Sequence, residues 1–279
     1  MSELLTERTP RVAAARKLLR RASRSGAGRF LVEGVRPVHE ALTWAGEADG
    51  SRAPRVHDLF LTDAVADRDP TLEDRARALG VRVARVTEKA AAGLSDTVTP
   101  QHVVAVCSTV TVGLDAALGA APRLVTALVG VADPGNAGTV IRTSDAAGAD
   151  AVVLAGDGRN QPVDPHNGKC VRSTMGSLFH LPLAVSRDVD AVVAALRERG
   201  LTLLAAAGDG ETVLDASADP LLAAPTAWLF GSEAHGLDDR TAALADHRVR
   251  VPIHGRAESL NLATAAAVCL YASARAQHA

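Results

Sequence analysis

The sequence predicts an α/β fold in two parts: a small N-terminal α/β/α domain and a larger C-terminal domain built on a parallel sheet. Two observations carry this prediction. Short apolar or alternating segments, typical of strands, take turns with segments of helical spacing. The alternation pauses in a Gly- and Pro-containing stretch at 111–122 and then restarts. With 279 residues and 47% hydrophobic residues, the chain is long enough for two domains with separate cores.

The N-terminal domain is expected over residues 1–110, including a basic extension at its start, and 111–122 is expected to be a linker. The first helix is basic and amphipathic (11–22), and the loop after it is rich in Ser and Gly (23–28). The later elements alternate: a strand followed by a helix over 30–42, a strand at 57–65, a helix at 72–80, a strand at 81–87, a helix and turn over 88–101, and a strand at 102–110.

The C-terminal domain, 123–279, opens with a nearly continuous apolar run at 124–132, which is typical of a parallel strand buried on both faces. The last helix, 260–275, is apolar almost all round, so we expect it to be buried or to lie in a subunit interface. The elements between them are a helix at 137–147, a strand at 151–156, a polar loop over 157–174 that leads into a short helix, a strand at 177–185, a helix at 188–200, and strands at 201–208, 226–231 and 249–253.

Charge is concentrated at the N-terminus, although the whole chain carries a formal net charge of only −2. Residues 1–30 contain eight basic and two acidic residues, a net charge of +6. A basic segment on a near-neutral protein favours contact with the phosphates of a nucleic acid. The alternative is a solvated, partly disordered tail.

Several classes of function find no support in the sequence. The three cysteines, at 107, 170 and 269, are too far apart in sequence to indicate a disulfide framework or a zinc ribbon, so a reducing cytoplasm is expected. The nine histidines form no HExxH or other metal motif, and we expect no metal. No apolar run is long enough to indicate a membrane span. Seven aromatic residues are too few for a broad platform of stacked bases.

Polar side chains gather where three predicted strands end. They lie in the segments DPGNAGTVIRTSDAAGA (133–149), WLFGSEAHGL (228–237) and VPIHGRAESLNLATAAAV (251–268). Open α/β sheets place their sites beyond the carboxyl ends of strands, so the residues to explain are Asn136, Arg142, Glu233, Ser259 and Asn261. Ordinary structural roles are the alternative: helix caps for Asn136 and Ser259, a surface position for Arg142, and a helix N-terminus for Glu233.

Taken in this order, the three segments resemble the three motifs of the SpoU/TrmH family of S-adenosylmethionine-dependent RNA ribose 2'-O-methyltransferases. The resemblance is strong over 123–275 and weaker over 28–108. It implies that the C-terminal segment forms a deep trefoil knot, that the enzyme is a homodimer, and that the five residues above form the catalytic site. In that family the matching arginine activates the ribose hydroxyl. A guanidinium stays protonated, so Arg142 either loses its proton transiently or orients the hydroxyl while a phosphate or Glu233 takes the proton.

The resemblance also assigns binding residues. S-adenosylmethionine would lie against backbone groups and apolar walls at Ala206, Leu229, Gly231, Gly236, Val251, Ile253 and Leu260. Many relatives carry Ile and Met where this chain has Val251 and Ile253, and both changes keep the wall apolar. The loop 157–176 resembles the segment that meets RNA. The expected phosphate contacts are Lys169 and Arg172 there, and Arg20, Arg21 and Arg29 near the N-terminus.

The N-terminal domain resembles a substrate-binding domain often fused to this family, through FLVEGVRPVHEAL and TVTPQHVVAV. Its presence favours 23S ribosomal RNA as the substrate. Two alternatives stay open: a transfer RNA 2'-O-methyltransferase, and a non-catalytic RNA-binding or ribosome-assembly factor of the same fold. Base methylation is disfavoured because related base-modifying enzymes carry different motifs.

Overall fold

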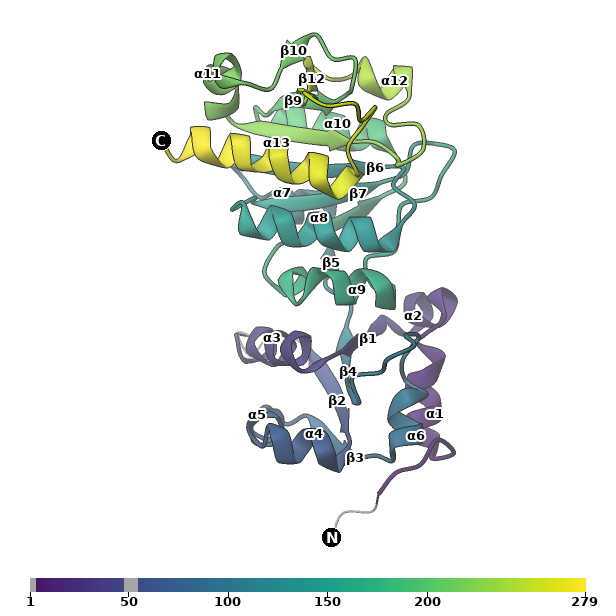
Figure 1. Ribbon diagram of the computed structural model, residues 1–279. Coiled ribbons are helices and arrows are strands. Elements are labelled where there is room, and N and C mark those ends of the chain that lie inside the picture. The colour runs from purple at the N-terminus through teal and green to yellow at the C-terminus, as the bar shows by residue number, and fades with distance from the viewer. Residues whose placement is uncertain (1–3, 48–54) are drawn as a thin grey trace. The chain divides into compact units, whose positions relative to one another are not determined.

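The computed structural model describes residues 4–47 and 55–279, and it has an α/β architecture in two compact units. One unit is the chain up to Thr109 together with Asp164–His180, and the other comprises Val110–Val163 and Leu181–Ala279. Figure 1 labels the elements of both. The division differs from the expected boundaries of 1–110 and 123–279, because residues 164–180 pack with the N-terminal unit and 111–122 belong to the C-terminal one.

The N-terminal unit is built on a mixed four-stranded sheet in the order β1-β4-β2-β3. Strand β4 runs antiparallel to both neighbours, and β2 and β3 are parallel. The strands are β1 (Arg29–Glu33), β2 (Val56–Leu61), β3 (Arg82–Arg85) and β4 (Val103–Ser108). The helices are α1 (Pro10–Lys17), α2 (Arg21–Ala27), α3 (Val35–Gly46), α4 (Asp63–Arg68), α5 (Thr71–Ala78), α6 (Glu88–Ala92), α9 (Gly168–Thr174) and the 3₁₀ turn η1 (Ser177–Phe179).

The basic N-terminal segment is folded into this unit. Val12, Ala15 and Leu18 of α1 are buried in its apolar core. The loop expected at 23–28 is wrong over most of its length, because helix α2 continues to Ala27 and ends at Gly28, whose φ of 60° lies in the left-handed region. The segment's exposed charges, on Arg16, Lys17, Arg20 and Arg21, are therefore held on a folded surface, whereas Arg11 pairs with Asp58.

Residues 164–180 contribute their own side chains to the N-terminal unit. The ring of Phe179 lies 5.3 Å from that of Trp44, centroid to centroid. Arg24, which is buried, donates to Asp164 at 2.6 Å. The strand expected at 177–185 is wrong in its first half, where the 3₁₀ turn η1 precedes strand β8 (Leu183–Ser186).

The C-terminal unit is built on an eight-stranded sheet in the order β10-β12-β9-β11-β6-β7-β8-β5. Every pair of neighbouring strands in it is parallel. The apolar runs of the central strands predicted this arrangement. The expected linker supplies the edge strand β5 (Thr111–Val112) and a short helix α7 (Leu114–Leu118). The other strands are β6 (Leu124–Val129), β7 (Ala151–Ala155), β9 (Thr202–Ala206), β10 (Thr212–Val213), β11 (Thr226–Phe230) and β12 (His247–Arg250).

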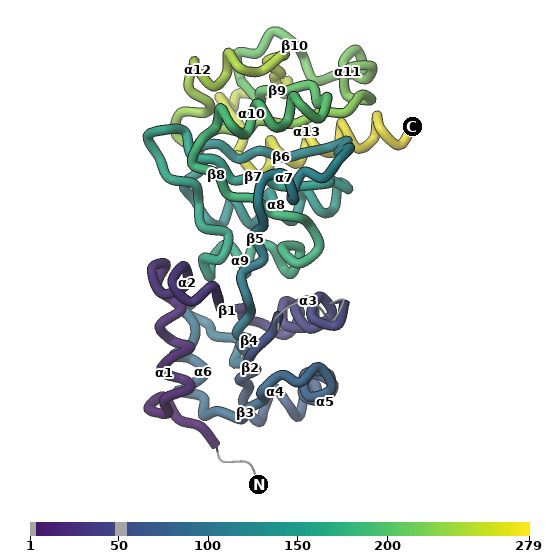
Figure 2. The backbone as a smooth tube through the Cα atoms, turned by 180° about the vertical axis from the view of Figure 1, so that it is seen from behind, coloured from purple at the N-terminus to yellow at the C-terminus, as the bar shows by residue number. Residues whose placement is uncertain are grey.

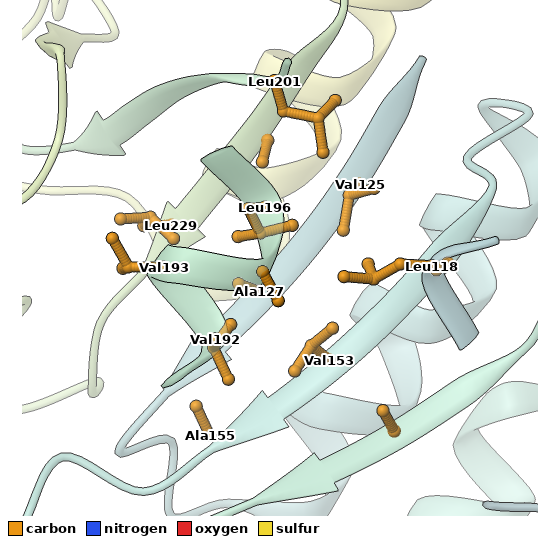
Figure 3. Close-up of a cluster of buried hydrophobic side chains, with 14 of the residues drawn as sticks. Leu118, Val125, Ala127, Val153, Ala155, Val192, Val193, Leu196, Leu201 and Leu229 are labelled. Carbon is orange, nitrogen blue, oxygen red and sulfur yellow. The ribbon is translucent and has the colours of Figure 1, made fainter. Parts of the chain in front are cut away.

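Helices cover both faces of this sheet. Helices α8 (Pro134–Ala146) and α13 (Leu262–Gln277) lie on one face, as Figure 1 shows, and α7 and α10 (Val189–Glu198) lie on the other, which faces the viewer in Figure 2. Figure 3 shows the core beneath α10, where Val192 and Leu196 pack over Ala127 of β6. Alternate strand residues face the opposite layer: Trp228 donates to Ser273 of α13 at 2.9 Å.

Short elements explain most other differences from expectation. The turn η2 (Ala216–Ala218) and helices α11 (Asp219–Ala223) and α12 (Asp239–Ala242) have too few residues to show a period. The strand expected at 249–253 ends at Arg250, and the chain then runs without regular structure to α13. In the described parts of the chain, no helix is both long and apolar enough to cross a bilayer.

Candidate active site

The first polar segment lies between β6 and α8, at the carboxyl edge of the parallel sheet. Asp133 is the N-cap of α8: its carboxylate accepts from the backbone N–H of Asn136 at 2.8 Å, and Pro134 follows at the first helical position. The ordinary role considered for Asn136 is therefore filled by Asp133. The side-chain amide of Asn136 is left free to make contacts outside its own helix. The sequence analysis missed Asp133 as the cap; Asp-Pro before a helical run is the sequence signal that could have identified it.

The second polar segment is a tight loop after β11. Ser232 and Gly236 exchange two backbone hydrogen bonds of 2.9 Å, which fold the loop back on itself. Gly231 lies so close to this turn that a Cβ there would be 2.0 Å from the carbonyl carbon of Gly236. Only glycine fits at that position without moving the backbone. The loop thus fixes Glu233 at its exposed tip.

The carboxylate of Glu233 holds the two segments together. One oxygen accepts from the backbone N–H of Asp133 at 3.1 Å and from the Asn136 amide at 3.0 Å. The other accepts from the backbone N–H of Ala132 at 3.2 Å. Partial burial works against ionisation, but these hydrogen bonds outweigh it and lower the pKa of Glu233 below its ordinary value. Glu233 is therefore an anion at neutral pH, with lone pairs already engaged by three donors.

The third polar segment joins this network through Asn261. Its side-chain oxygen accepts from the backbone N–H of Ala263 at 2.9 Å, so Asn261 is the N-cap of α13. That cap position had been considered for Ser259, and the helix begins two residues later than expected. The amide nitrogen of Asn261 donates to the side-chain oxygen of Asn136 at 3.2 Å. Asn261, Asn136 and Glu233 thus form one continuous chain of hydrogen bonds across three strand ends.

Arg142 lies outside this chain of hydrogen bonds. It is exposed on α8, and among the described residues its guanidinium has no ion-pair or hydrogen-bond partner. An unpaired, solvated guanidinium is available to a substrate that approaches the exposed face of α8.

A cavity of about 620 Å³ lies beside the network, within the C-terminal unit. This volume is in the range of sites that bind small molecules and cofactors. Glu233 and Ser259 stand in its wall. The wall also includes six of the seven residues expected to bind the cofactor: Ala206, Gly231, Gly236, Val251, Ile253 and Leu260.

The seventh residue, Leu229, differs from expectation. Its side chain lies in the apolar core that faces α10, and Phe230 stands in the cavity wall instead. Successive residues of a strand face opposite sides, so only one of the two can meet the cavity. Leu229 supports the wall from behind.

The chemistry of the cavity suits S-adenosylmethionine. Its walls combine apolar side chains such as Phe230 and Ile253 with the backbone of several glycines, including Gly208 and Gly255. The backbone N–H and C=O groups are the donors and acceptors that an adenine and an amino acid group require. Among the described residues, no group of three or more His, Cys, Asp or Glu side chains is arranged to hold a metal ion.

The expected RNA-contact residues lie in the N-terminal unit. Arg20, Arg21 and Lys169 are exposed, and Arg29 is half-buried at the start of β1. Arg172 has an internal role: it pairs with Asp96 at 2.5 Å and with the buried Glu33 at 3.4 Å. Contact with a phosphate remains a prediction for all five.

Comparison with known proteins identifies both parts of the chain. Residues 123–271 match the SpoU rRNA methylase family, and residues 9–105 match the MRM3-like substrate binding domain. The chain is 34% identical to the 23S rRNA (guanosine(2553)-2'-O)-methyltransferase RlmP of Bacillus subtilis, over 97% of this chain and 98% of that protein. It is 32% identical to the 23S rRNA (uridine(2479)-2'-O)-methyltransferase of Streptomyces viridochromogenes, over 97% and 91%.

Solved structures agree with these relatives. The SpoU methyltransferase AviRb of Streptomyces viridochromogenes, in complex with AdoMet, superposes with a TM-score of 0.78 at 30% identity, covering 96% of this chain and 98% of that one. An AdoMet-bound rRNA methyltransferase from Sinorhizobium meliloti gives a TM-score of 0.78 at 29% identity, covering 99% and 97%.

Proposed function

The chain belongs to the SpoU rRNA methylase family, and from that membership we propose that it transfers the methyl group of S-adenosylmethionine to a ribose 2'-hydroxyl of 23S ribosomal RNA. The observation that carries the proposal is the hydrogen-bonded array of Asn136, Glu233 and Asn261, which joins the three segments beside a cavity lined by the second and third of them. The relatives that span nearly the whole chain are named as 23S rRNA 2'-O-methyltransferases.

The bound cofactor supplies an electrophilic methyl group, and the protein's task is to place the ribose oxygen in line with it. Positioning of this kind provides a large part of the acceleration of a two-substrate reaction. Asn136 and Asn261 hold each other and are held in turn by Glu233 and the N-terminus of α13. The array is therefore preorganised before RNA binds.

The hydroxyl must lose its proton as its oxygen attacks. The lowered pKa of Glu233 makes this carboxylate a weak proton acceptor, and its oxygens already accept three hydrogen bonds. A protonated Arg142 has no lone pair to offer. We assign Arg142 to orienting and polarising the hydroxyl, Glu233 to holding Asn136 and the loop after β11, and proton acceptance to an RNA phosphate oxygen or water.

The N-terminal unit is assigned to binding the RNA. It matches a substrate-binding domain over residues 9–105, and Arg20 and Arg21 stand exposed on a folded surface. A cytoplasmic location is part of the proposal, because ribosomal RNA is its substrate.

The proposal includes a homodimer and a knotted chain. Val268 and Tyr271 of α13 are 41% and 53% exposed, although the opposite side of the same helix is buried, so an apolar stripe is left for a second copy. The knot is supported by the path after β12: this strand lies beyond β9, yet α13 returns to pack on α8.

The test is transfer of labelled methyl from S-adenosylmethionine to total RNA from cells that lack this protein, followed by separation of ribosomal from transfer RNA. Label in 23S RNA supports the proposal. Label confined to transfer RNA would keep the chemistry and replace the substrate. Failure to bind the cofactor at all would favour a non-catalytic RNA-binding factor.

A further inference from the structure

Two exposed arginines that are not among the expected RNA-contact residues lie at the same sheet edge as the site, and one of them, Arg159, belongs to the loop 157–176 that was expected to meet RNA. Arg159 follows β7 and Arg187 follows β8, the next strand in the sheet. Neither guanidinium has an ion-pair or hydrogen-bond partner within the described ranges 4–47 and 55–279. Most other arginines of the C-terminal unit are different in this respect: Arg197, Arg199, Arg240, Arg248 and Arg275 pair with carboxylates.

The backbone that carries Arg159 is held tightly in place. Asp157 accepts from the backbone N–H of Arg159 at 2.9 Å and from the side-chain amide of Asn160 at 2.8 Å. Gly158 has a φ of 85°, which closes the turn. These hydrogen bonds also lower the pKa of Asp157 despite the opposing effect of partial burial, so the clamp stays charged at neutral pH.

The same turn touches the strand that leads into the active site. A Cβ at Gly130, just after β6, would be 2.4 Å from a carboxylate oxygen of Asp157, so the two loops are in direct contact. Two residues later, the N–H groups of Ala132 and Asp133 hold Glu233. Arg159 therefore projects from a loop packed against the segment that anchors the catalytic array.

Arg187 is placed beside this loop by strand register. Ala155 of β7 pairs with Ser186 of β8, and the N–H of Gly156 donates to the Ser186 carbonyl at 2.9 Å. A Cβ at Gly156 would lie 2.9 Å from the carbonyl oxygen of Asn160 and 3.2 Å from that of Arg187. Gly156 is thus packed against both the turn that carries Arg159 and the backbone of Arg187.

We propose that Arg159 and Arg187 form an anion-binding edge that holds a phosphodiester of the RNA next to the ribose to be methylated. Guanidinium groups bind phosphate oxygens through paired, charge-assisted hydrogen bonds. An RNA whose 2'-hydroxyl enters the site carries a phosphate on each side of that ribose, and one of them must be held if the hydroxyl is to stay in line. This assignment rests on the proposed function and adds two substrate-binding residues to it.

The experiment measures binding of the full-length protein to unmodified, transcribed 23S ribosomal RNA between about 50 and 200 mM salt. Arg159→Ala and Arg187→Ala should each reduce the slope of log affinity against log salt concentration by part of the about 0.7–0.9 that one phosphate contact contributes. The double variant should lose the full about 0.7–0.9, because both side chains hold the same phosphodiester, and Arg159→Lys should keep the slope. Methyl transfer, as kcat/KM for RNA, should fall by about 10- to 100-fold in each alanine variant because a charged hydrogen bond is lost.

Arg123→Ala is the matched control. Arg123 is an exposed arginine of the same unit, but it lies at the start of β6, on the opposite edge of the sheet. For Arg123→Ala, the salt-dependence slope of RNA binding and the kcat/KM for RNA should equal those of the wild type. Cofactor affinity should be unchanged in all three alanine variants, since none of the three arginines lines the cavity. Tm should be unchanged in Arg159→Ala and Arg187→Ala, whereas Arg123→Ala also gives up a 3.1 Å hydrogen bond to the Ala223 carbonyl.

Unchanged slopes in both Arg159→Ala and Arg187→Ala, or a fall of equal size in Arg123→Ala, would overturn the assignment. The outcome is separate from that of the proposed function. RNA binding reports on the two arginines whether or not methyl is transferred, whereas the proposed function fails if the wild-type chain methylates no RNA.

Discussion

Replacing Glu233 by Gln tests whether this carboxylate holds the site together. The carboxylate accepts three hydrogen bonds, two on one oxygen and one on the other. Glutamine can keep its oxygen toward Asp133 and Asn136, but its NH₂ group must then face the N–H of Ala132. The change removes one charge-assisted hydrogen bond, and it brings two donors, the glutamine NH₂ and the Ala132 N–H, face to face.

The expected loss of stability follows from this loss of one charge-assisted hydrogen bond. A hydrogen bond to a charged group contributes about 1.5–3 kcal/mol, and because Glu233 is exposed we expect the lower end, about 1–2 kcal/mol after solvent screening. For a domain of this size, Tm should fall by about 2–8 °C. Turnover should drop by about 10- to 100-fold, the amount that a change in position of the neighbouring Asn136 can cause, and the cofactor dissociation constant should rise only a few fold.

Stability and turnover are measured by scanning calorimetry and by methyl transfer to RNA, with Glu198→Gln as the control. Glu198 is an exposed carboxylate at the end of α10, remote in sequence from the three motifs. The lowered pKa of Glu233 also predicts a pH effect: its contribution to stability is present above its ordinary pKa of 4.5 and is lost as the pH falls through the lower pKa of the folded state. The glutamine variant should lack that contribution. Wild-type Tm and turnover in Glu233→Gln would refute the role assigned to this side chain.

Three further changes have expected outcomes. Arg142→Ala should reduce turnover by at least about 100-fold, because the variant loses a group that acts on the reacting centre. The cofactor dissociation constant, measured by isothermal titration calorimetry, should stay within a few fold of the wild-type value. Full activity in this variant would show that Arg142 takes no part in the chemistry. Gly231→Ala should destabilise the C-terminal unit by about 1–3 kcal/mol and weaken cofactor binding, because the new methyl would overlap the backbone of Gly236. In Gly208→Ala, where a Cβ meets no atom, Tm should stay at the wild-type value, and equal melting of the two variants would contradict the steric argument. Burial lowers the pKa of His166 to about 4; Arg24 lowers it further and Asp164 opposes the shift. The folded state therefore keeps this side chain neutral, and the stability of the protein should fall as the pH drops from about 6.5 to about 4. The Tm of His166→Gln should depend less on pH over that range, and a pH dependence equal to that of the wild type would contradict the prediction.

The three segments of the candidate site could be predicted from the sequence because their signals are local. Strand ends, glycines and polar residues occur together at 133–149, 228–237 and 251–268, and parallel strands bring such ends to one edge. The hydrogen bonds from Asn261 to Asn136 and from Asn136 to Glu233 join residues about a hundred positions apart. No pattern within one segment specifies those partners.

Packing between distant segments explains what the sequence did not reveal. Residues 164–180 were expected to be the end of a polar loop, a short helix and the start of a strand of the C-terminal domain. Phe179 and Asp164 instead find their partners, Trp44 and Arg24, in the N-terminal unit. The basic segment likewise read as an extension, although three of its apolar residues complete a core. Arg159 was not named among the RNA contacts, although its loop 157–176 was expected to meet RNA, because its surroundings, Asp157 against Gly130, exist only after folding.

The most direct test of the central claim is the identity of the methylated product. Unmodified 23S ribosomal RNA is incubated with the protein and S-adenosylmethionine carrying a labelled methyl group, then digested to nucleosides and separated. The account predicts that the label is recovered in a single nucleoside methylated on its ribose 2'-oxygen, and that Arg142→Ala yields none. Label on a base, or no label from a protein that binds both cofactor and RNA, would contradict it.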